Sequence, residues 1–280
     1  MKKIMIAAAV LAALTACNKT LIESPVADSE YGYINFGLSS DLEIVDTKAS
    51  ATVTKNNSTY NVYLKQGTTD KWTSGDKNYK EYGDIAENDL KVPAGTYVIE
   101  AENYTETEAE AANNGYGDVR VKGSSQSFNV VAGASTAKVT VSCVPVNAKV
   151  TVAFADGFTD VFNTPTITLI DGSRNLAMTP ATAAAVTSDQ TTTYNHTVEV
   201  GTSVAYFNVD NGALSWKIEA IVGESKKTYS STFTVEANKW NKITFKAGKN
   251  GNIVFDLSAD TDITESKEIT PEIDPLNPQN

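Results

Sequence analysis

The stretch Ala137-Lys-Val-Thr-Val-Ser-Cys-Val-Pro-Val-Asn-Ala-Lys-Val-Thr-Val-Ala-Phe154 decides the fold of this chain. Apolar and polar residues alternate as far as Cys143, and the same alternation starts again at Val150. A period of two is typical of a strand with one buried face. Pro145 lacks the N–H that a ladder needs, so it separates the two strands. The stretch therefore predicts two β-structured units that meet near residue 145.

Short segments with the same alternation lie on both sides of this stretch, separated by clusters of Gly, Asn and Asp. Examples are Ile34/Phe36, Tyr97/Ile99/Ala101, Ile167/Leu169, Leu214/Trp216/Ile218, Ile243/Phe245 and Ile253/Phe255/Leu257. About seven short strands in each half are typical of an antiparallel sandwich. We therefore expect an all-β protein with two tandem antiparallel β-sandwiches, at residues 30–145 and 146–260.

Three local signals add detail to this pattern. In residues 90–102, Pro93 presets φ at the first corner of a turn and Gly95 can adopt a positive φ, which predicts a hairpin between two strands. Residues 106–113 (Glu-Thr-Glu-Ala-Glu-Ala-Ala-Asn) could form two turns of helix within a loop. Beyond Leu257 the chain is acidic, polar and rich in proline, so residues 261–280 are expected to form a flexible tail.

The composition excludes several classes of function. The 280 residues carry 23 Lys and Arg against 34 Asp and Glu, a net charge of −11, which gives no electrostatic reason to bind nucleic acid. One histidine and two cysteines are too few for a zinc site or a nucleophilic triad with any redundancy. We therefore expect a non-enzymatic protein without cofactor or metal. An enzyme with a carboxylate pair stays a third alternative, because the separation that defines such a pair is not visible in a sequence.

The N-terminus predicts a cleaved leader and a lipid anchor. Lys2 and Lys3 precede about eleven apolar residues, too few to span a bilayer, so residues 1–16 are interpreted as a signal peptide. The sequence Leu14-Thr-Ala-Cys17 resembles a bacterial lipobox, which predicts acylation of Cys17, with palmitate among the chains, and a lipidated tether over residues 17–29. Cys143 is then the remaining thiol, and its position on the apolar side of a strand predicts that it is buried and inert.

Five features of the sequence together resemble a known group of proteins. They are the lipobox, the first strand (residues 33–38), Asp46-Thr-Lys-Ala49, the segment of residues 92–101 and the double strand of residues 139–152. The group consists of Bacteroidetes lipoproteins with an uncharacterised tandem domain, related to the fimbrillin-like and fimbrial-anchor families. The resemblance implies transthyretin-like or immunoglobulin-like sandwiches, attachment to the outer membrane with display at the cell surface rather than on the periplasmic face, and fimbrial or pilus subunits as partners.

The same resemblance suggests a processing site. In fimbrillins a protease cuts after a basic residue that follows the first strand, and a donor strand then replaces the strand that is lost. Lys48 occupies the similar place in this chain. The proline-rich residues 261–280 would make a poor donor strand. We therefore expect an anchor or tip subunit that keeps its first strand.

One segment combines aromatic residues with lysines and aspartates, and it is the best candidate for a binding surface: Tyr60, Tyr63, Trp72, Tyr79 and Tyr82. Such rings can stack on sugars or on protein partners. The alternative is that Tyr60 and Trp72 pack in the core. The leading hypothesis for function is adhesion or fimbria-like assembly, and the alternative is a carbohydrate-binding surface lipoprotein that captures polysaccharide or other surface glycans. Exposed rings would favour sugar binding, and a groove beside strand edges would favour assembly.

Overall fold

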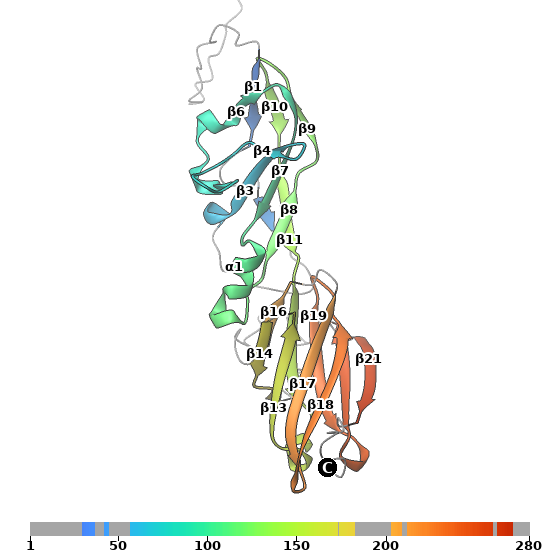
Figure 1. Cartoon of the computed structure of the whole chain (residues 1–280). Coiled ribbons are helices and arrows are strands. Elements are labelled where there is room, and N and C mark those ends of the chain that lie inside the picture. The colour runs from blue at the N-terminus through green and yellow to red at the C-terminus, as the bar shows by residue number, and fades with distance from the viewer. Residues whose placement is uncertain are drawn as a thin grey trace, which may run out of the picture.

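The computed structural model describes residues 30–36, 42–44, 57–172, 174–182, 203–208, 212–259 and 262–270. Within these residues the protein is an elongated all-β molecule made of two units stacked end to end (Figure 1). The fold class expected from the sequence, an all-β protein built from sandwiches, is confirmed. Among the same residues, no helix is long and apolar enough to cross a bilayer.

The described part of the N-terminal unit contains two sheets and one α-helix. Its strands are β1 (Tyr31–Asn35), β2 (Leu42–Ile44), β3 (Asn61–Gln66), β4 (Thr69–Asp70), β5 (Lys80–Glu81), β6 (Lys91–Pro93), β7 (Gly95–Glu102), β8 (Val121–Ser124), β9 (Phe128–Val130), β10 (Ser135–Lys138) and β11 (Val141–Pro145). One sheet has the order β10-β1-β6, and the other has the order β2-β11-β8-β7-β3-β4, with β5 on β3 and β9 on β7. Helix α1 (Glu106–Ala111) starts at Thr105, whose hydroxyl accepts a hydrogen bond from the Glu108 N–H, as in a capping box.

The predicted hairpin around Pro93 and Gly95 is wrong. β6 pairs with β1, whereas β7 pairs with β3, β8 and β9, so residues 93–95 carry the chain from one sheet to the other. Gly95 does not have a positive φ. A Cβ at Gly95 would lie 2.5 Å from the side-chain nitrogen of Gln66, which is the far end of a flexible side chain and can move aside.

The C-terminal unit is a two-layer sandwich. Its strands are β12 (Ala148–Phe154), β13 (Asn163–Asp171), β14 (Arg174–Met178), β15 (Ala181–Thr182), β16 (Val204–Phe207), β17 (Ala213–Val222), β18 (Ser225–Thr234), β19 (Trp240–Ala247), β20 (Ile253–Ala259) and β21 (Asp262–Ile269), with a short helix α2 (Phe158–Val161). The layers have the orders β14-β13-β17-β18 and β15-β12-β19-β20-β21, and β16 pairs with β12. Trp216 joins the layers, because its ring contacts those of Phe245 and Phe255 at centroid distances of 4.9 and 5.6 Å.

Each unit has a hydrophobic cluster of its own. The N-terminal cluster gathers the alternate residues of β1, β3, β7, β8 and β11, and the C-terminal cluster gathers those of β12, β13 and β16–β20 together with Ile269. Tyr206 of β16 is an exception, because it belongs to the N-terminal cluster. The sequence boundary near Pro145 coincides with the end of β11, and independent folding of the two units stays a prediction.

Two further features differ from the sequence prediction. The sheets are not wholly antiparallel, because β1 pairs in parallel with β10, β2 with β11, and β12 with both β15 and β19. The tail predicted to begin at residue 261 is wrong for residues 262–269, because β21 pairs antiparallel with β20 and buries Ile269. Backbone hydrogen bonds to a neighbouring strand hold this polar segment in the sheet, so it needs few apolar side chains. Residues 271–280 lie outside the described part of the chain.

Candidate functional site

The aromatic segment does not form an exposed platform. Tyr60, Trp72 and Tyr82 are at most 3% exposed and belong to the N-terminal cluster, and Tyr79 is 8% exposed. Phe36 packs against Tyr82 and Trp72, at ring-centroid distances of 5.4 and 6.2 Å. The expected binding surface is therefore wrong for these four rings, and the core interpretation of Tyr60 and Trp72 is right. The first strand supplies the side chain that covers two of them.

Tyr63 is half-buried, and its ring belongs to a side-chain network. Its hydroxyl donates a 2.7 Å hydrogen bond to a carboxylate oxygen of Glu102, and Glu102 also forms a 2.8 Å ion pair with Arg120. Burial, followed by this hydrogen bond, holds the pKa of Tyr63 well above its ordinary value. The ring of Tyr79 lies 5.4 Å away. These contacts fix Tyr63 in place, so it is not a free stacking surface.

The two other predicted site residues, Cys17 and Lys48, lie outside the described residues. The first strand, β1, precedes Lys48 in the sequence and belongs to the described residues. β1 lies between β10 and β6, and both Ile34 and Phe36 are 2% exposed. β2 continues this segment and pairs with β11. The first strand is therefore an integral part of the N-terminal core.

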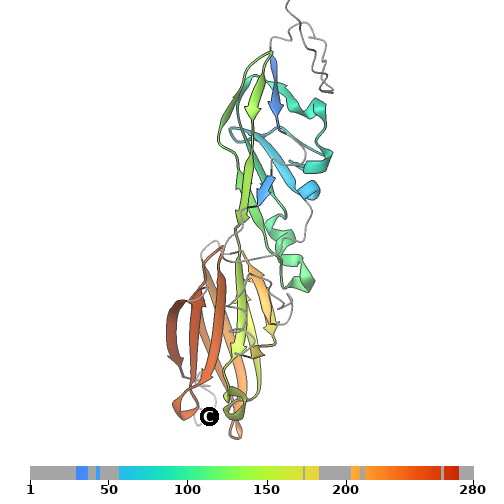
Figure 2. The ribbon, with the colours of Figure 1, turned by 180° about the vertical axis from the view of Figure 1, so that it is seen from behind.

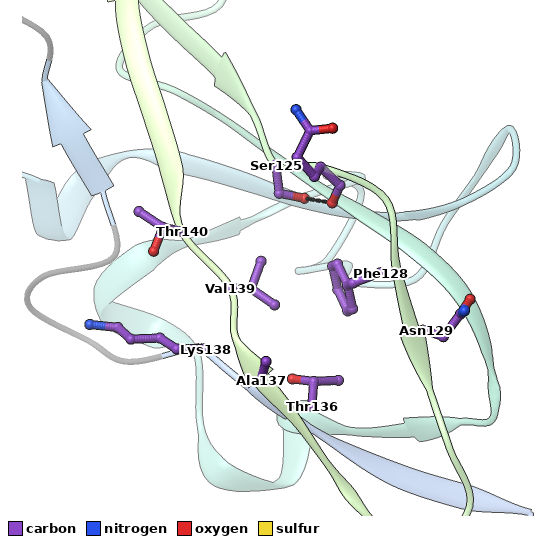
Figure 3. A pocket seen from close by; sticks show the side chains of 9 residues that line it. Ser125, Phe128, Asn129, Thr136, Ala137, Lys138, Val139 and Thr140 are labelled. Atoms are coloured by element: carbon purple, nitrogen blue, oxygen red, sulfur yellow. Dashed lines mark hydrogen bonds between the residues drawn. The ribbon is translucent and has the colours of Figure 1, made fainter.

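A groove opens where two consecutive strand pairs diverge. β8 pairs with β11, with Gly123 opposite Cys143. Further along, β9 turns to pair with β7, whereas β10 pairs with β1. A groove of about 390 Å³ lies between β9 and β10 (Figure 3). Its lining residues are Ser125, Gln126, Phe128, Asn129, Thr136, Ala137, Lys138, Val139 and Thr140.

The lining has an apolar centre. The side chains of Phe128 and Val139 lie between the two strands, whereas those of Asn129, Lys138 and Thr140 extend to the outer sides of the strands (Figure 3). Among the described strands, β9 pairs only with β7 and β10 pairs only with β1. A strand with one unpaired edge can accept an extended segment through its backbone N–H and C=O groups. The groove is therefore the candidate contact site of the N-terminal unit.

Sequence reasoning missed this groove for a clear reason. Phe128/Val130 and Val139/Val141 show the alternation of two ordinary strands, and nothing in that pattern tells which neighbour each strand pairs with. The divergence depends on β1 and β7, which lie far away in the sequence.

The described residues offer little other reactive chemistry. No group of three or more His, Cys, Asp or Glu side chains among them is placed to hold a metal ion. Cys143 is fully buried, and burial raises the pKa of its thiol to about 12. A thiol of that kind is not a nucleophile near neutral pH.

Comparison with known proteins gives the family. The family model described as "Domain of unknown function (DUF4493)" matches residues 30–275. The chain belongs to this family. No curated protein matches the sequence.

Among solved structures, the DUF4493 chain is similar to a "putative cell adhesion protein" of Bacteroides eggerthii. The identity is 12%, the match covers 84% of this chain and 97% of that chain, and the TM-score is 0.40. A protein of the same description from Bacteroides ovatus has 10% identity, coverage of 87% and 98%, and a TM-score of 0.38. A "putative adhesin" of Bacteroides ovatus has 7% identity, coverage of 79% and 93%, and a TM-score of 0.37.

Proposed function

We propose that this protein is a non-enzymatic surface protein of the outer membrane, anchored by lipid on Cys17, that acts in adhesion or fimbria-like assembly as an anchor or tip subunit. The observation that carries the proposal is the place of the first strand. β1 is paired on both sides, and Ile34 within it and Phe36 directly after it belong to the N-terminal core.

Retention of this strand follows from the cost of losing it. Burying a large apolar side chain stabilises a protein by about 1.5–3 kcal/mol. Loss of Ile34 and Phe36 would therefore remove several kcal/mol and would uncover Trp72 and Tyr82. Cleavage after Lys48 would also separate Cys17 from the folded body. An uncut chain keeps both its core and its anchor.

The last described strand supports the same role. β21 pairs with β20 along the whole length of β21, and Ile269 is packed in the C-terminal cluster. A segment that completes its own sheet is not free to complete the sheet of a neighbour. A subunit that keeps both β1 and β21 in its own sheets fits the end of an assembly better than its repeating middle.

The groove between β9 and β10 is the proposed contact site for a partner. An extended protein segment could pair with one of the two strand edges and place an apolar side chain against Phe128 and Val139. The carbohydrate alternative depended on exposed rings in residues 60–82. Four of those five rings are buried, so it has no specific observation in its favour.

Mass spectrometry of the protein from its own cells tests the anchor role. We expect an acylated N-terminus at Cys17, both in membrane fractions and in any assembled material. A Lys48→Gln variant is the matched control, because it should assemble as the unmodified chain does. An N-terminus at Ala49 in assembled material, with loss of assembly in Lys48→Gln, would refute the anchor role.

Site-specific photo-crosslinking tests the groove. A crosslinker at Asn129, an exposed residue of β9, should capture an extended segment of a partner in intact cells, and Ala137→Trp should block the capture by filling the groove. A crosslinker at Thr228, on the C-terminal unit, is the control. Equal capture at Asn129 and Thr228, or capture at Asn129 that persists in Ala137→Trp, would show that the groove is not the contact site.

A further inference from the structure

We propose that the junction between the two units is a rigid joint, in which Arg174 and an exchange of two tyrosines hold the units as one body. The joint would keep the distal loops of the C-terminal unit in a fixed direction from the end of the molecule where β1 lies. Both views place β1 at the end of the elongated molecule that lies farthest from the C-terminal unit (Figures 1 and 2).

Each unit contributes one tyrosine to the other. Tyr206 of β16 is 6% exposed and packs in the N-terminal cluster. Tyr116 packs against the C-terminal cluster, and its hydroxyl donates a 2.7 Å hydrogen bond to the Ala177 carbonyl in β14. The Tyr206 N–H donates a 2.8 Å bond to the Tyr116 carbonyl, so the backbones are also joined at this point. Any rotation of one unit against the other has to withdraw a tyrosine from its cluster.

Arg174 of β14 binds both the N-terminal unit, at Gly115, and strand β16, at Tyr206 and Phe207. Its guanidinium donates to the Gly115 carbonyl at 2.6 and 3.2 Å and to the Tyr206 carbonyl at 2.8 Å, and it lies 4.8 Å from the centre of the Phe207 ring. The planar fork of arginine fixes the directions of all these bonds together, which a lysine could not do.

Two asparagines add further bonds across the junction. The Asn208 side-chain amide donates to the Glu106 carbonyl at 3.2 Å and to the Glu110 carboxylate at 3.1 Å, which ties β16 to helix α1. Asn147, directly between β11 and β12, accepts a bond from the Arg120 N–H and donates one to the Asp118 carbonyl. The backbone carbonyl of Asn147 accepts a bond from the Asn238 N–H of the C-terminal unit. The linker is therefore bonded to both units and does not provide a hinge.

The close approach at the junction depends on Gly117. A Cβ at this position would lie 2.8 Å from the Tyr206 carbonyl oxygen and 3.2 Å from a guanidinium nitrogen of Arg174. Gly117 has a φ of +83°. Gly133 has a similar φ of +72°, but a Cβ there would meet nothing within 4 Å. Replacing each glycine by alanine therefore separates interdomain contact from backbone strain.

Two domains in one chain ordinarily move relative to each other, so a rigid joint would be a departure that a distance measurement between the units can detect. We would attach nitroxides to Gln126→Cys and Thr232→Cys, one on each unit, in the full mature chain with Cys17→Ser, and measure the distance distribution by pulsed electron paramagnetic resonance. Cys143 is buried and should stay unlabelled. The unmodified junction should give one narrow distribution.

Gly117→Ala should at least double the width of that distribution or shift its maximum, and Gly133→Ala should leave it unchanged. Arg174→Ala and Arg174→Lys should both broaden it, because neither side chain can make the forked bonds. If Gly117→Ala does not fold, Arg174→Ala decides the question. A broad distribution for the unmodified junction, or a narrow one for Arg174→Ala, would overturn the proposal.

Discussion

Replacing Phe36 by alanine tests how firmly the first strand is held. Phe36 is 2% exposed and contacts the rings of Tyr82 and Trp72 at 5.4 and 6.2 Å. Truncation of a core phenylalanine to alanine costs about 3–5 kcal/mol, because it removes buried apolar surface and leaves a cavity. Each 1.4 kcal/mol is about a tenfold change in an equilibrium constant, so the unfolded fraction of the N-terminal unit should rise by roughly two to four orders of magnitude.

Urea denaturation followed by tryptophan fluorescence measures this change. Trp72 belongs to the N-terminal cluster, whereas Trp216 and Trp240 belong to the other unit, so the transition reported by Trp72 should move to lower urea. Val131→Ala is the control, because Val131 is 62% exposed and its truncation should change the free energy of unfolding by no more than about 0.5 kcal/mol. A loss below about 1 kcal/mol in Phe36→Ala would show that the first strand is not part of the folded core.

Three further predictions concern the anchor, the last strand and the buried thiol. Cys17→Ser should move the protein from the membrane fraction to the soluble fraction in detergent partitioning, and unchanged partitioning would exclude the lipid anchor. A chain ending at residue 261 should melt at a lower temperature than one ending at residue 270, because β20 loses its ladder with β21 and Ile269 leaves the core; equal melting temperatures would contradict the pairing. Cys143 should react with a thiol reagent at pH 8 only after unfolding. The thiol ionises with its ordinary pKa of 9.0 in the unfolded chain and with a pKa of about 12 in the folded chain. The contribution of Cys143 to stability should therefore be complete below pH 9 and fall as the pH rises towards 12. Denaturation of the Cys143 and Cys143→Ala chains at several pH values measures this change.

The sequence by itself determined which side of the alternating segments is buried. Val139, Val141 and Cys143 share one parity, and the structure buries all three. The break at Pro145 marked the end of β11, and the acid-rich segment after Thr105 formed helix α1. These features are local, because successive side chains of a strand point to opposite faces and a capping residue acts within one turn. A single stretch of sequence therefore contains enough information to predict them.

Only the tertiary structure decided which strands meet. The sequence shows that residues 60–82 contain five aromatic rings, but it does not show which rings are buried. The contacts of Phe36 with Tyr82 and Trp72 reveal that these two are core residues and not a binding surface. The polar composition of residues 262–269 suggested a tail, but these residues form β21 because they pair with the edge of β20. The groove beside Phe128 and the exchange of Tyr116 and Tyr206 depend on partners far away in the sequence. The period of a strand fixes the direction of its side chains, whereas its neighbour is chosen by contacts that form only when the whole chain has folded.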